Sequence, residues 1–276
     1  MKKKLALILA GTAMAAMVLA GCGEKNNASG EDVKTAESVE DKKTFTVGFD
    51  AEYPPYGYMD ENGEYTGFDL ELAEAVCKLE GWELVKKPLN WDSKDMELNS
   101  GSIDCIWNGF TMNGREDDYT FSTPYVDNSQ VIVVAEKSGI DTLEDLAGKT
   151  VGVQAASAAL DLLQSEEEGG QKKLADTFGA LNEFADYNTA FTELQAGALD
   201  ALAIDVGVAN YQIKSRGEGY KILDETLNTE QYAIGFKKGN QELCDVVNAD
   251  LKKLTEDGTV AKLAEKYEIA DMGTLK

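Results

Sequence analysis

The sequence predicts an α/β fold in two lobes that are joined by two crossings of the chain. Strand-like stretches alternate with helical patterns along most of the sequence, which favours a mostly parallel sheet built from βαβ units. This alternation begins again near residue 142, after a buried apolar strand at 131–134. Roughly 230 residues follow the polar N-terminal region, which is enough for two lobes of about a hundred residues each.

The first 21 residues have the pattern of an export signal. Lysines at positions 2–4 precede an apolar run at 5–20 that is too short and too rich in small residues for a stable membrane span. The run ends in Leu-Ala-Gly-Cys22, which resembles a bacterial lipobox, in which cleavage before the cysteine allows its thiol to be diacylated. We therefore predict a lipoprotein signal peptide at 1–21 and a lipid (palmitate) anchor on Cys22. An ordinary signal peptide with an incidental cysteine is the alternative.

Residues 22–43 are polar and charged, with almost no large apolar side chain. Such a segment cannot bury enough surface to order itself, so we expect a flexible tether. Acyl chains on Cys22 would then hold an otherwise soluble domain at the outer face of a bacterial cell membrane.

Composition excludes several classes of function. With 50 acidic and 26 basic residues the formal charge is −24, which argues against nucleic acid or anionic lipid as a partner. The absence of histidine excludes Ser-His-Asp and Cys-His catalysis and histidine-ligated metals. Cys77, Cys105 and Cys244 lie in apolar settings outside any CxxC spacing, so buried, unreactive thiols are expected, at least one of them unpaired. We predict no metal and no cofactor.

The first lobe is predicted over 44–132 and is completed by 232–270, before a tail at 271–276. A helix is expected from Asp69, a suitable N-cap, to Gly81, which suits a helix end. Two prolines interrupt regular structure after the first strand. The other expected elements are strands at 44–49, 82–89, 103–107 and 232–236, a turn at 60–63, and helices at 93–99, 241–256 and 259–267.

The second lobe is predicted over 133–231, with crossings near 131–136 and 230–236. A glycine follows each of the helical patterns that end at 146 and 196, as expected at helix ends. The expected elements are helices at 142–146, 157–165 and 189–196, and strands at 150–154, 180–184 and 201–204.

The stretch 107–117 follows an apolar strand, where ligands bind in open α/β sheets. Gly109 lacks a Cβ, so the backbone there can approach a ligand closely. Arg115 offers a planar fork of donors that matches a carboxylate. We interpret the stretch as a grip for a small carboxylate ligand; a polar surface turn with a solvated arginine is the alternative.

Several motifs recur in the order of a known family. They are Gly48-Phe-Asp-Ala-Glu-Tyr-Pro-Pro-Tyr, Gly67-Phe-Asp-Leu-Glu-Leu-Ala, Ser100-Gly-Ser-Ile-Asp, Asn108-Gly-Phe-Thr, Phe121-Ser-Thr-Pro-Tyr, Leu143-Glu-Asp-Leu-Ala-Gly-Lys-Thr-Val-Gly-Val-Gln, Gly197-Ala-Leu-Asp-Ala and Asp257-Gly-Thr. Over residues 45–268 the sequence resembles the family 3 extracellular solute-binding proteins, the receptors of polar amino-acid ABC importers. The resemblance implies a type II periplasmic-binding-protein-like fold with a ligand cleft between the lobes. It also implies a monomer that delivers a free polar amino acid to permease subunits.

The resemblance also implies site residues. Arg115 matches the arginine that binds the ligand α-carboxylate, and Ser157 and Ala158 fall at a helix N-terminus that would complete this site. Asp205 matches the aspartate that binds the α-ammonium; an N-cap is its structural alternative. The remaining positions are the Gly109 carbonyl and Thr111 hydroxyl beside the ammonium, and Tyr53, Trp91, Asp50, Glu52 and Asn108 around the side chain. Thr111 and Arg115 are four residues apart, one fewer than in most members.

We expect binding without catalysis. A lyase acting on cyclohexadienyl carboxylates, with Asp50 or Glu52 as a general acid or base, is an alternative, and an extracellular sensor is another. The ligand stays open, because Asp50 and Glu52 suit a cationic side chain whereas Trp107 and Asn108 suit a neutral polar one.

Overall fold

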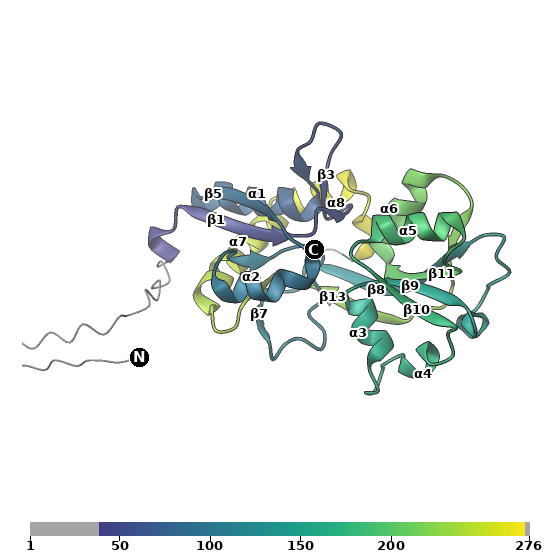
Figure 1. Ribbon diagram of the computed structural model, residues 1–276. Coiled ribbons are helices and arrows are strands. Elements are labelled where there is room, and N and C mark those ends of the chain that lie inside the picture. The colour runs from purple at the N-terminus through teal and green to yellow at the C-terminus, as the bar shows by residue number, and fades with distance from the viewer. Residues whose placement is uncertain (1–38, 274–276) are drawn as a thin grey trace, which may run out of the picture. The chain divides into compact units, whose positions relative to one another are not determined.

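The structure, a computed structural model, describes residues 39–273. Two large mixed β-sheets with helices packed against them make up most of this part of the chain (Figure 1). The first sheet has the strand order β5-β1-β6-β14-β7, and the second has the order β10-β9-β11-β8-β12, with β13 also paired to β8. We refer to each sheet with its helices as the first and the second lobe. The predicted two-lobed α/β fold is confirmed.

The first lobe is built around β1, whose phenylalanine and valine side chains are fully buried. Strands β5 and β6 lie on either side of β1 and run parallel to it, whereas β14 is antiparallel to β6 and β7. The strands are β1 (Thr44–Phe49), β5 (Glu83–Pro88), β6 (Cys105–Ile106), β7 (Tyr119–Phe121) and β14 (Gly235–Lys237). The helices are α1 (Phe68–Glu80), α2 (Lys94–Ser100), α7 (Gln241–Glu256) and α8 (Thr259–Lys266).

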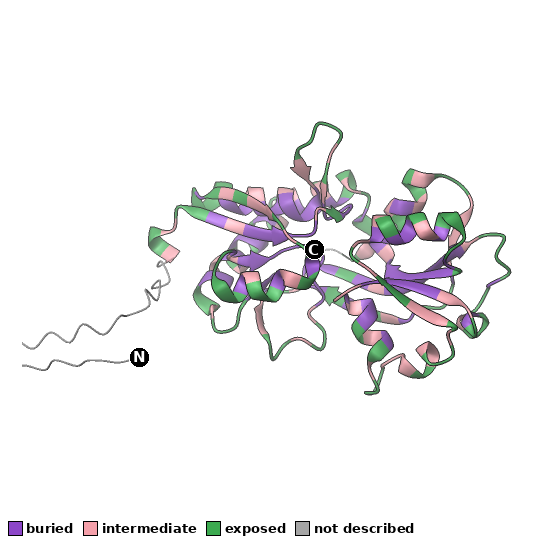
Figure 2. Ribbon diagram, viewed as in Figure 1, coloured by how far each residue is buried: buried purple, intermediate pink, exposed green. Residues whose placement is uncertain are grey.

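The second lobe is built around β8, β9 and β11, whose side chains are mostly buried (Figure 2). Strands β9, β10 and β11 are parallel, but β8 is antiparallel to β11, β12 and β13, so less of this sheet is parallel than predicted. The strands are β8 (Val126–Ala135), β9 (Thr150–Gln154), β10 (Ala180–Phe184), β11 (Ala201–Asp205), β12 (Tyr220–Ile222) and β13 (Asn228–Tyr232). The helices are α3 (Ala158–Gln164), α4 (Lys172–Ala175), α5 (Tyr187–Ala196) and α6 (Val206–Arg216).

The chain passes between the sheets twice, once from β7 to β8 and once from β13 to β14. The predicted first crossing near 131–136 and the boundary at residue 132 are misplaced, because β8 lies in the second sheet from Val126 onward. The two passages lie side by side. The Tyr125 amide donates to the Tyr232 carbonyl at 2.9 Å, and the Ser122 amide donates to the Ile234 carbonyl at 3.0 Å.

Local differences from the predicted elements have identifiable causes. Helix α1 begins at Phe68 after Gly67, so Asp69 lies inside the first turn, fully buried, and is not the N-cap. The strand expected at 103–107 is reduced to Cys105–Ile106. The strand expected at 232–236 is divided, because its residues form the end of β13, a passage and the start of β14.

The polar N-terminal region becomes ordered earlier than predicted. A 3₁₀ turn spans Val39–Asp41, and the Lys42 ammonium lies 2.6 Å from the Asp104 carboxylate, so the tether ends before residue 43. Another 3₁₀ turn, Ala270–Met272, lies partly in the predicted tail. The predicted signal peptide, Cys22 and most of the tether lie outside the described residues. Within 39–273, no helix has the length and apolar character needed to cross a lipid bilayer.

The three cysteines that the structure describes, Cys77, Cys105 and Cys244, are buried and unpaired, as expected. Burial raises the pKa of Cys77 to about 12 and that of Cys244 to about 11. Their thiols are therefore protonated at neutral pH and pack as small apolar side chains.

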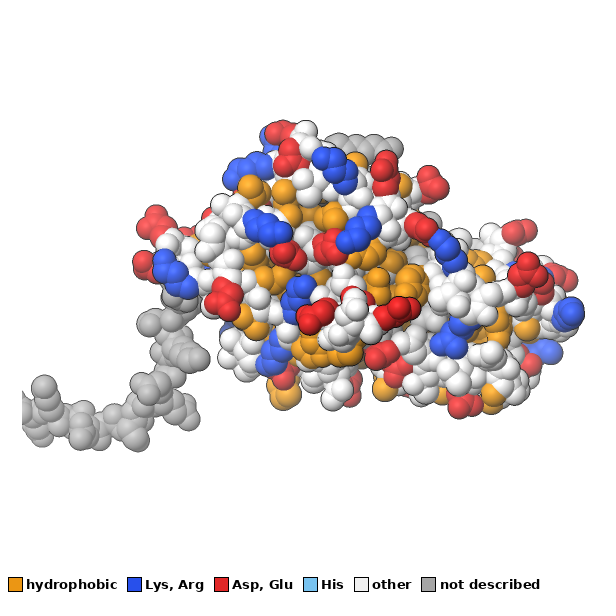
Figure 3. Space-filling model, turned by 90° about the horizontal axis from the view of Figure 1, so that it is seen from above, with side chains coloured by type: hydrophobic (Ala, Val, Ile, Leu, Met, Phe, Trp, Pro, Cys, Tyr) orange, Lys and Arg blue, Asp and Glu red, His pale blue; other side chains and the backbone are white. Residues whose placement is uncertain are grey.

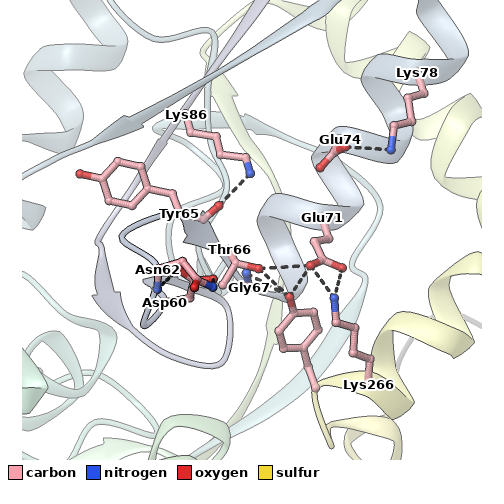
Figure 4. Close-up of polar contacts among 11 residues, drawn as sticks. Asp60, Asn62, Tyr65, Thr66, Gly67, Glu71, Glu74, Lys78, Lys86 and Lys266 are labelled. Carbon is pink, nitrogen blue, oxygen red and sulfur yellow. Dashed lines mark hydrogen bonds and ion pairs between the residues drawn. The ribbon is translucent and has the colours of Figure 1, made fainter.

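A small three-stranded sheet connects β1 to α1. Its strands are β2 (Glu52–Tyr53), β3 (Gly57–Met59) and β4 (Tyr65–Thr66). Glu71 of α1 fastens it to the C-terminal helix (Figure 4). The Glu71 carboxylate accepts hydrogen bonds from Lys266 Nζ at 2.6 Å, Tyr267 Oη at 2.7 Å and Thr66 Oγ1 at 3.1 Å. The Tyr267 hydroxyl also accepts from the Gly67 amide at 3.2 Å.

Gly67 is the tightest point of this junction. Its φ is +134°, and a Cβ there would lie 2.1 Å from the Tyr56 carbonyl oxygen. We expect Gly67→Ala to lower the free energy of unfolding by about 3 kcal/mol or more, because rigid backbone would have to move. Urea denaturation measures this. Gly63→Ala is the control: its φ is also positive, at +82°, but nothing lies within 4 Å, so a loss of about 1 kcal/mol is expected. Equal losses would contradict the steric argument.

Candidate functional site

Side chains of both lobes line two cavities. The larger, of about 700 Å³, is lined by Thr111, Arg115 and Glu230 together with Ala158 and Asp161 of α3. The smaller, of about 540 Å³, is lined by the loop after β1, Trp91 and the residues around the end of β10. Over the face seen in Figure 3, lysine and arginine side chains are interspersed with aspartate and glutamate and form no single basic patch.

Arg115 lies in the larger cavity and is largely buried, with 14% of its side chain exposed. Its Nη2 lies 2.7 Å from the carboxylate of Asp161, and its Nη1 donates to the Thr111 carbonyl at 3.4 Å. The guanidinium also stacks over the Phe110 ring, 5.0 Å from its centre. Arg115 is therefore held in the cavity and already binds a carboxylate from the opposite lobe.

Asp205 ends β11 and is buried. Although it occupies the N-cap position of α6, its side chain makes no capping hydrogen bond. Instead, Oδ1 accepts from Tyr232 Oη at 2.7 Å, Asn128 Nδ2 at 2.8 Å and Gln130 Nε2 at 2.6 Å. The capping interpretation is therefore wrong for this side chain, which points into a polar cluster.

Glu230 belongs to the same cluster, and sequence reasoning missed it. Its Oε1 accepts from Thr111 Oγ1 at 2.7 Å and from the amides of Asn128 and Gln130 at 2.8 Å each. Burial raises the pKa of both Asp205 and Glu230, and the Asp205 charge raises that of Glu230 further. A sequence signal did exist: Asn128 and Gln130, and Glu230 and Tyr232, are two apart, so each pair faces one side of its strand.

Gly109 is positioned by Asp69. The Gly109 amide donates to Asp69 Oδ2 at 2.5 Å, and the Tyr125 hydroxyl donates to the same oxygen at 2.9 Å. The φ of Gly109 is +55°, and a Cβ there would lie 2.9 Å from the Tyr232 ring and 3.1 Å from that of Tyr53. Glycine is therefore required both by the backbone conformation and by the packed rings.

Ser157 and Ala158 begin α3. The buried Ser157 hydroxyl accepts from the Leu160 amide at 3.1 Å and so caps the helix, while Ala158 lines the larger cavity. The preceding Ala156 has a φ of +55°, a conformation that alanine adopts less readily than glycine.

The residues predicted to surround the ligand side chain do not all line one cavity. Trp91, Asp50 and Glu52 line the smaller cavity. Tyr53 is buried, with its hydroxyl 3.4 Å from that of Tyr232, and Asn108 is also buried. Tyr53 and Asn108 line neither cavity, and neither do Asp205, Gly109 or Ser157.

Asp50 joins the two lobes. Its carboxylate accepts from Gln154 Nε2 of β9 at 2.6 Å and from the Glu52 amide at 2.8 Å. Burial raises the pKa of Asp50 to about 6, and the Asp186 and Glu52 charges add to the rise. Glu52 itself accepts a hydrogen bond from Asn188 of α5. Of the residues that the structure describes, five carboxylates and no lysine or arginine line the smaller cavity: Asp50, Glu52, Asp92, Glu183 and Asp186.

Comparisons with known proteins agree with this architecture. Residues 45–270 match the bacterial extracellular solute-binding proteins, family 3. The chain belongs to this family. The L-cystine-binding protein TcyJ of Escherichia coli K12 is 30% identical over 262 residues, 94% of each chain. The arginine-binding extracellular protein ArtP of Bacillus subtilis is 33% identical over 271 residues, 97% of this chain and 98% of ArtP.

A solved structure is also similar. The substrate-binding protein of an ABC uptake transporter from Streptococcus pneumoniae, with bound histidine, is 33% identical and superposes with a TM-score of 0.80. The match covers 86% of this chain and 97% of that protein. These relatives are amino-acid-binding proteins and not enzymes, so an amino-acid-binding role is supported.

Asp69 gives a testable pH dependence. Burial raises its pKa from 3.8 to about 7, so the folded protein holds this proton more tightly than the unfolded chain. The resulting stabilisation is present below pH 3.8 and is lost as the pH rises to about 7. We expect the melting temperature of the wild type to fall more between pH 5 and pH 8 than that of Asp69→Asn, with a difference of up to about 2.5 kcal/mol in unfolding free energy. Parallel pH profiles would contradict the raised pKa.

Proposed function

We propose that this protein is the extracellular substrate-binding component of an ABC importer for a polar amino acid. The lobes would bind the α-carboxylate and the α-ammonium of the ligand between them and deliver it to the permease subunits. A lipid on Cys22 would hold the domain, as a monomer, at the outer face of the cell membrane.

The observation that carries this proposal is the position of Thr111 between a cation and an anionic pair. The Thr111 carbonyl accepts from Arg115, and its hydroxyl donates to Glu230, which shares its amide donors with Asp205. Thr111 therefore joins a guanidinium, which could bind the ligand's carboxylate, to a carboxylate pair, which could bind the ligand's ammonium. This arrangement is complementary to the two charges of a free amino acid.

A few charge-assisted hydrogen bonds of this kind would supply enough free energy to bind the amino acid with micromolar affinity. Hydrogen bonds to charged groups contribute about 1.5–3 kcal/mol each, and micromolar affinity needs only about 8 kcal/mol. The paired passages between the sheets favour hinge motion of one lobe against the other, which would admit and release the ligand. The named relatives bind cystine, arginine and histidine, so relatedness alone selects no ligand.

Calorimetric titration with the twenty amino acids and cystine tests the proposal. We expect one-site binding of at least one of them, and a loss of at least about thirtyfold in affinity for Arg115→Ala and for Asp205→Asn, because each leaves a ligand charge unpaired. Arg216→Ala is the control, since Arg216 of α6 stacks over Phe191 and is not among the residues that line either cavity. The proposal fails if none of these ligands binds the folded wild type.

Asp161 would compete with the ligand for Arg115. Its carboxylate occupies Nη2 of Arg115 but is itself 61% exposed, and such ion pairs contribute at most about 1 kcal/mol. We therefore expect Asp161→Asn to raise the affinity for the amino acid by about two- to fivefold in the same titration. Glu167→Gln, at another acidic residue of the cavity lining, is the control. A fall in affinity would show that Asp161 instead stabilises the contact between the lobes.

A further inference from the structure

Glu230 and Asp205 form a pair of buried carboxylates that share the same donors. Asn128 Nδ2 lies 2.8 Å from an oxygen of each, and Gln130 Nε2 lies 2.6 Å from Asp205 and 2.8 Å from Glu230. Only 3% of Asp205 and 6% of Glu230 are exposed. The two carboxylate oxygens therefore lie within the span of two hydrogen bonds, away from bulk water.

This pair has more acceptors than donors around it. Within residues 39–273, neither carboxylate forms an ion pair with a lysine or arginine. The amide oxygens of Asn128 and Gln130, in the same buried cluster, also have no hydrogen-bond partner there. A group with several N–H donors and a positive charge would satisfy these oxygens, and a primary ammonium, with three donors and no acceptor, fits.

Tyrosine side chains surround Asp205. Glu230 contacts the Thr111 hydroxyl and lines the larger cavity, where Lys94 forms an ion pair with Asp95 and Arg115 forms one with Asp161. The titratable and charged groups that face the pair are Tyr53, Tyr56, Tyr187 and Tyr232, and, along the cavity, Lys94, Asp95, Arg115, Asp118, Asp161, Glu167 and Glu168.

Two adjacent buried carboxylates resist ionising together. Desolvation raises the pKa of each, and their mutual repulsion means that the pair loses its protons in two separate steps. The two carboxylates therefore ionise together less readily than either would alone.

We propose that Glu230 is a second carboxylate for the ligand's ammonium group, and that the ligand-free pair of carboxylates retains a proton that the ammonium displaces. The ammonium keeps its three hydrogens, and the displaced proton passes to the solvent. The inference rests on the proposed function and adds to it a specificity-determining residue.

Proton release on binding tests this inference. The probe is the amino acid that binds most tightly in the titration of the twenty amino acids and cystine. It is titrated calorimetrically at pH 5, 6, 7 and 8 in phosphate and in Bis-Tris, which have different ionisation enthalpies. For the wild type we expect release of up to one proton per ligand in the lower part of this range, with affinity rising up to about tenfold per pH unit. The N-acetyl form of the same amino acid should not bind.

Glu230→Gln isolates the second carboxylate. Glutamine keeps the acceptor oxygen for Thr111, Asn128 and Gln130, so the fold is preserved, as a melting curve will show. We expect this variant to bind at least about tenfold more weakly at pH 8 and to release no proton, after the wild type is used to correct for protons of the ligand itself. Glu136→Gln, at an exposed position just after β8, should behave like the wild type.

The outcomes separate the two proposals. If the wild type binds an amino acid without releasing a proton, or if Glu230→Gln binds and releases protons like the wild type, the inference is overturned while the proposed function stands. If no amino acid binds the wild type, the proposed function fails and the inference fails with it. Binding of the N-acetylated amino acid with equal affinity would also overturn the inference.

Discussion

The hydrogen bonds of Asp69 fix the frame on which the candidate site depends. One carboxylate oxygen of this α1 residue holds both the Gly109 amide and the Tyr125 hydroxyl. Gly109 belongs to the loop that carries Thr111 and Arg115, and Tyr125 belongs to the passage that leads into the second sheet. Helix α1, this loop and the passage are thus joined at a single buried acceptor. Because no water can replace a lost partner at this depth, the three segments keep a fixed relation.

The site is built from carboxylates that would be more stable in water. Asp50, Asp69, Asp205 and Glu230 are all buried, and burial raises the pKa of each. Hydrogen bonds from amides and hydroxyls offset part of this cost, but they carry no full positive charge. The same carboxylates that would attract an ammonium therefore lower the stability of the ligand-free fold. A ligand that brings an ammonium supplies the missing charge, so binding would stabilise a cluster that is unfavourable in the ligand-free protein.

The sequence predicted elements best where the signal was local. Helix α7 and strands β1, β9 and β10 have the predicted bounds, because helix-stop residues and apolar patterns mark them directly. Strand β8 was recognised only from its apolar half, since Asp127 to Gln130 are polar although they belong to the same strand. The first passage was therefore predicted too late in the chain, near 131–136, although β8 already begins at Val126. Glu230 was missed for a related reason: β13 is rich in polar residues, and the two-residue spacing of Glu230 and Tyr232 gains its meaning from the pairing of β13 with β8, which buries both side chains.

The short spacing between Thr111 and Arg115 illustrates what sequence alone leaves open. Counting residues could not say whether a loop one residue shorter than in most members still directs the guanidinium toward a ligand. In the structure the loop closes as a turn, with the Arg115 amide bonded to the Met112 carbonyl at 3.0 Å. The side chain then folds back over Phe110 and reaches the Thr111 carbonyl. The cation thus lies beside Thr111, whose hydroxyl donates to Glu230, so one residue contacts both a cation and a carboxylate. A free amino acid, whose carboxylate and ammonium groups are bonded to one carbon atom, would suit that arrangement if the function proposed above holds.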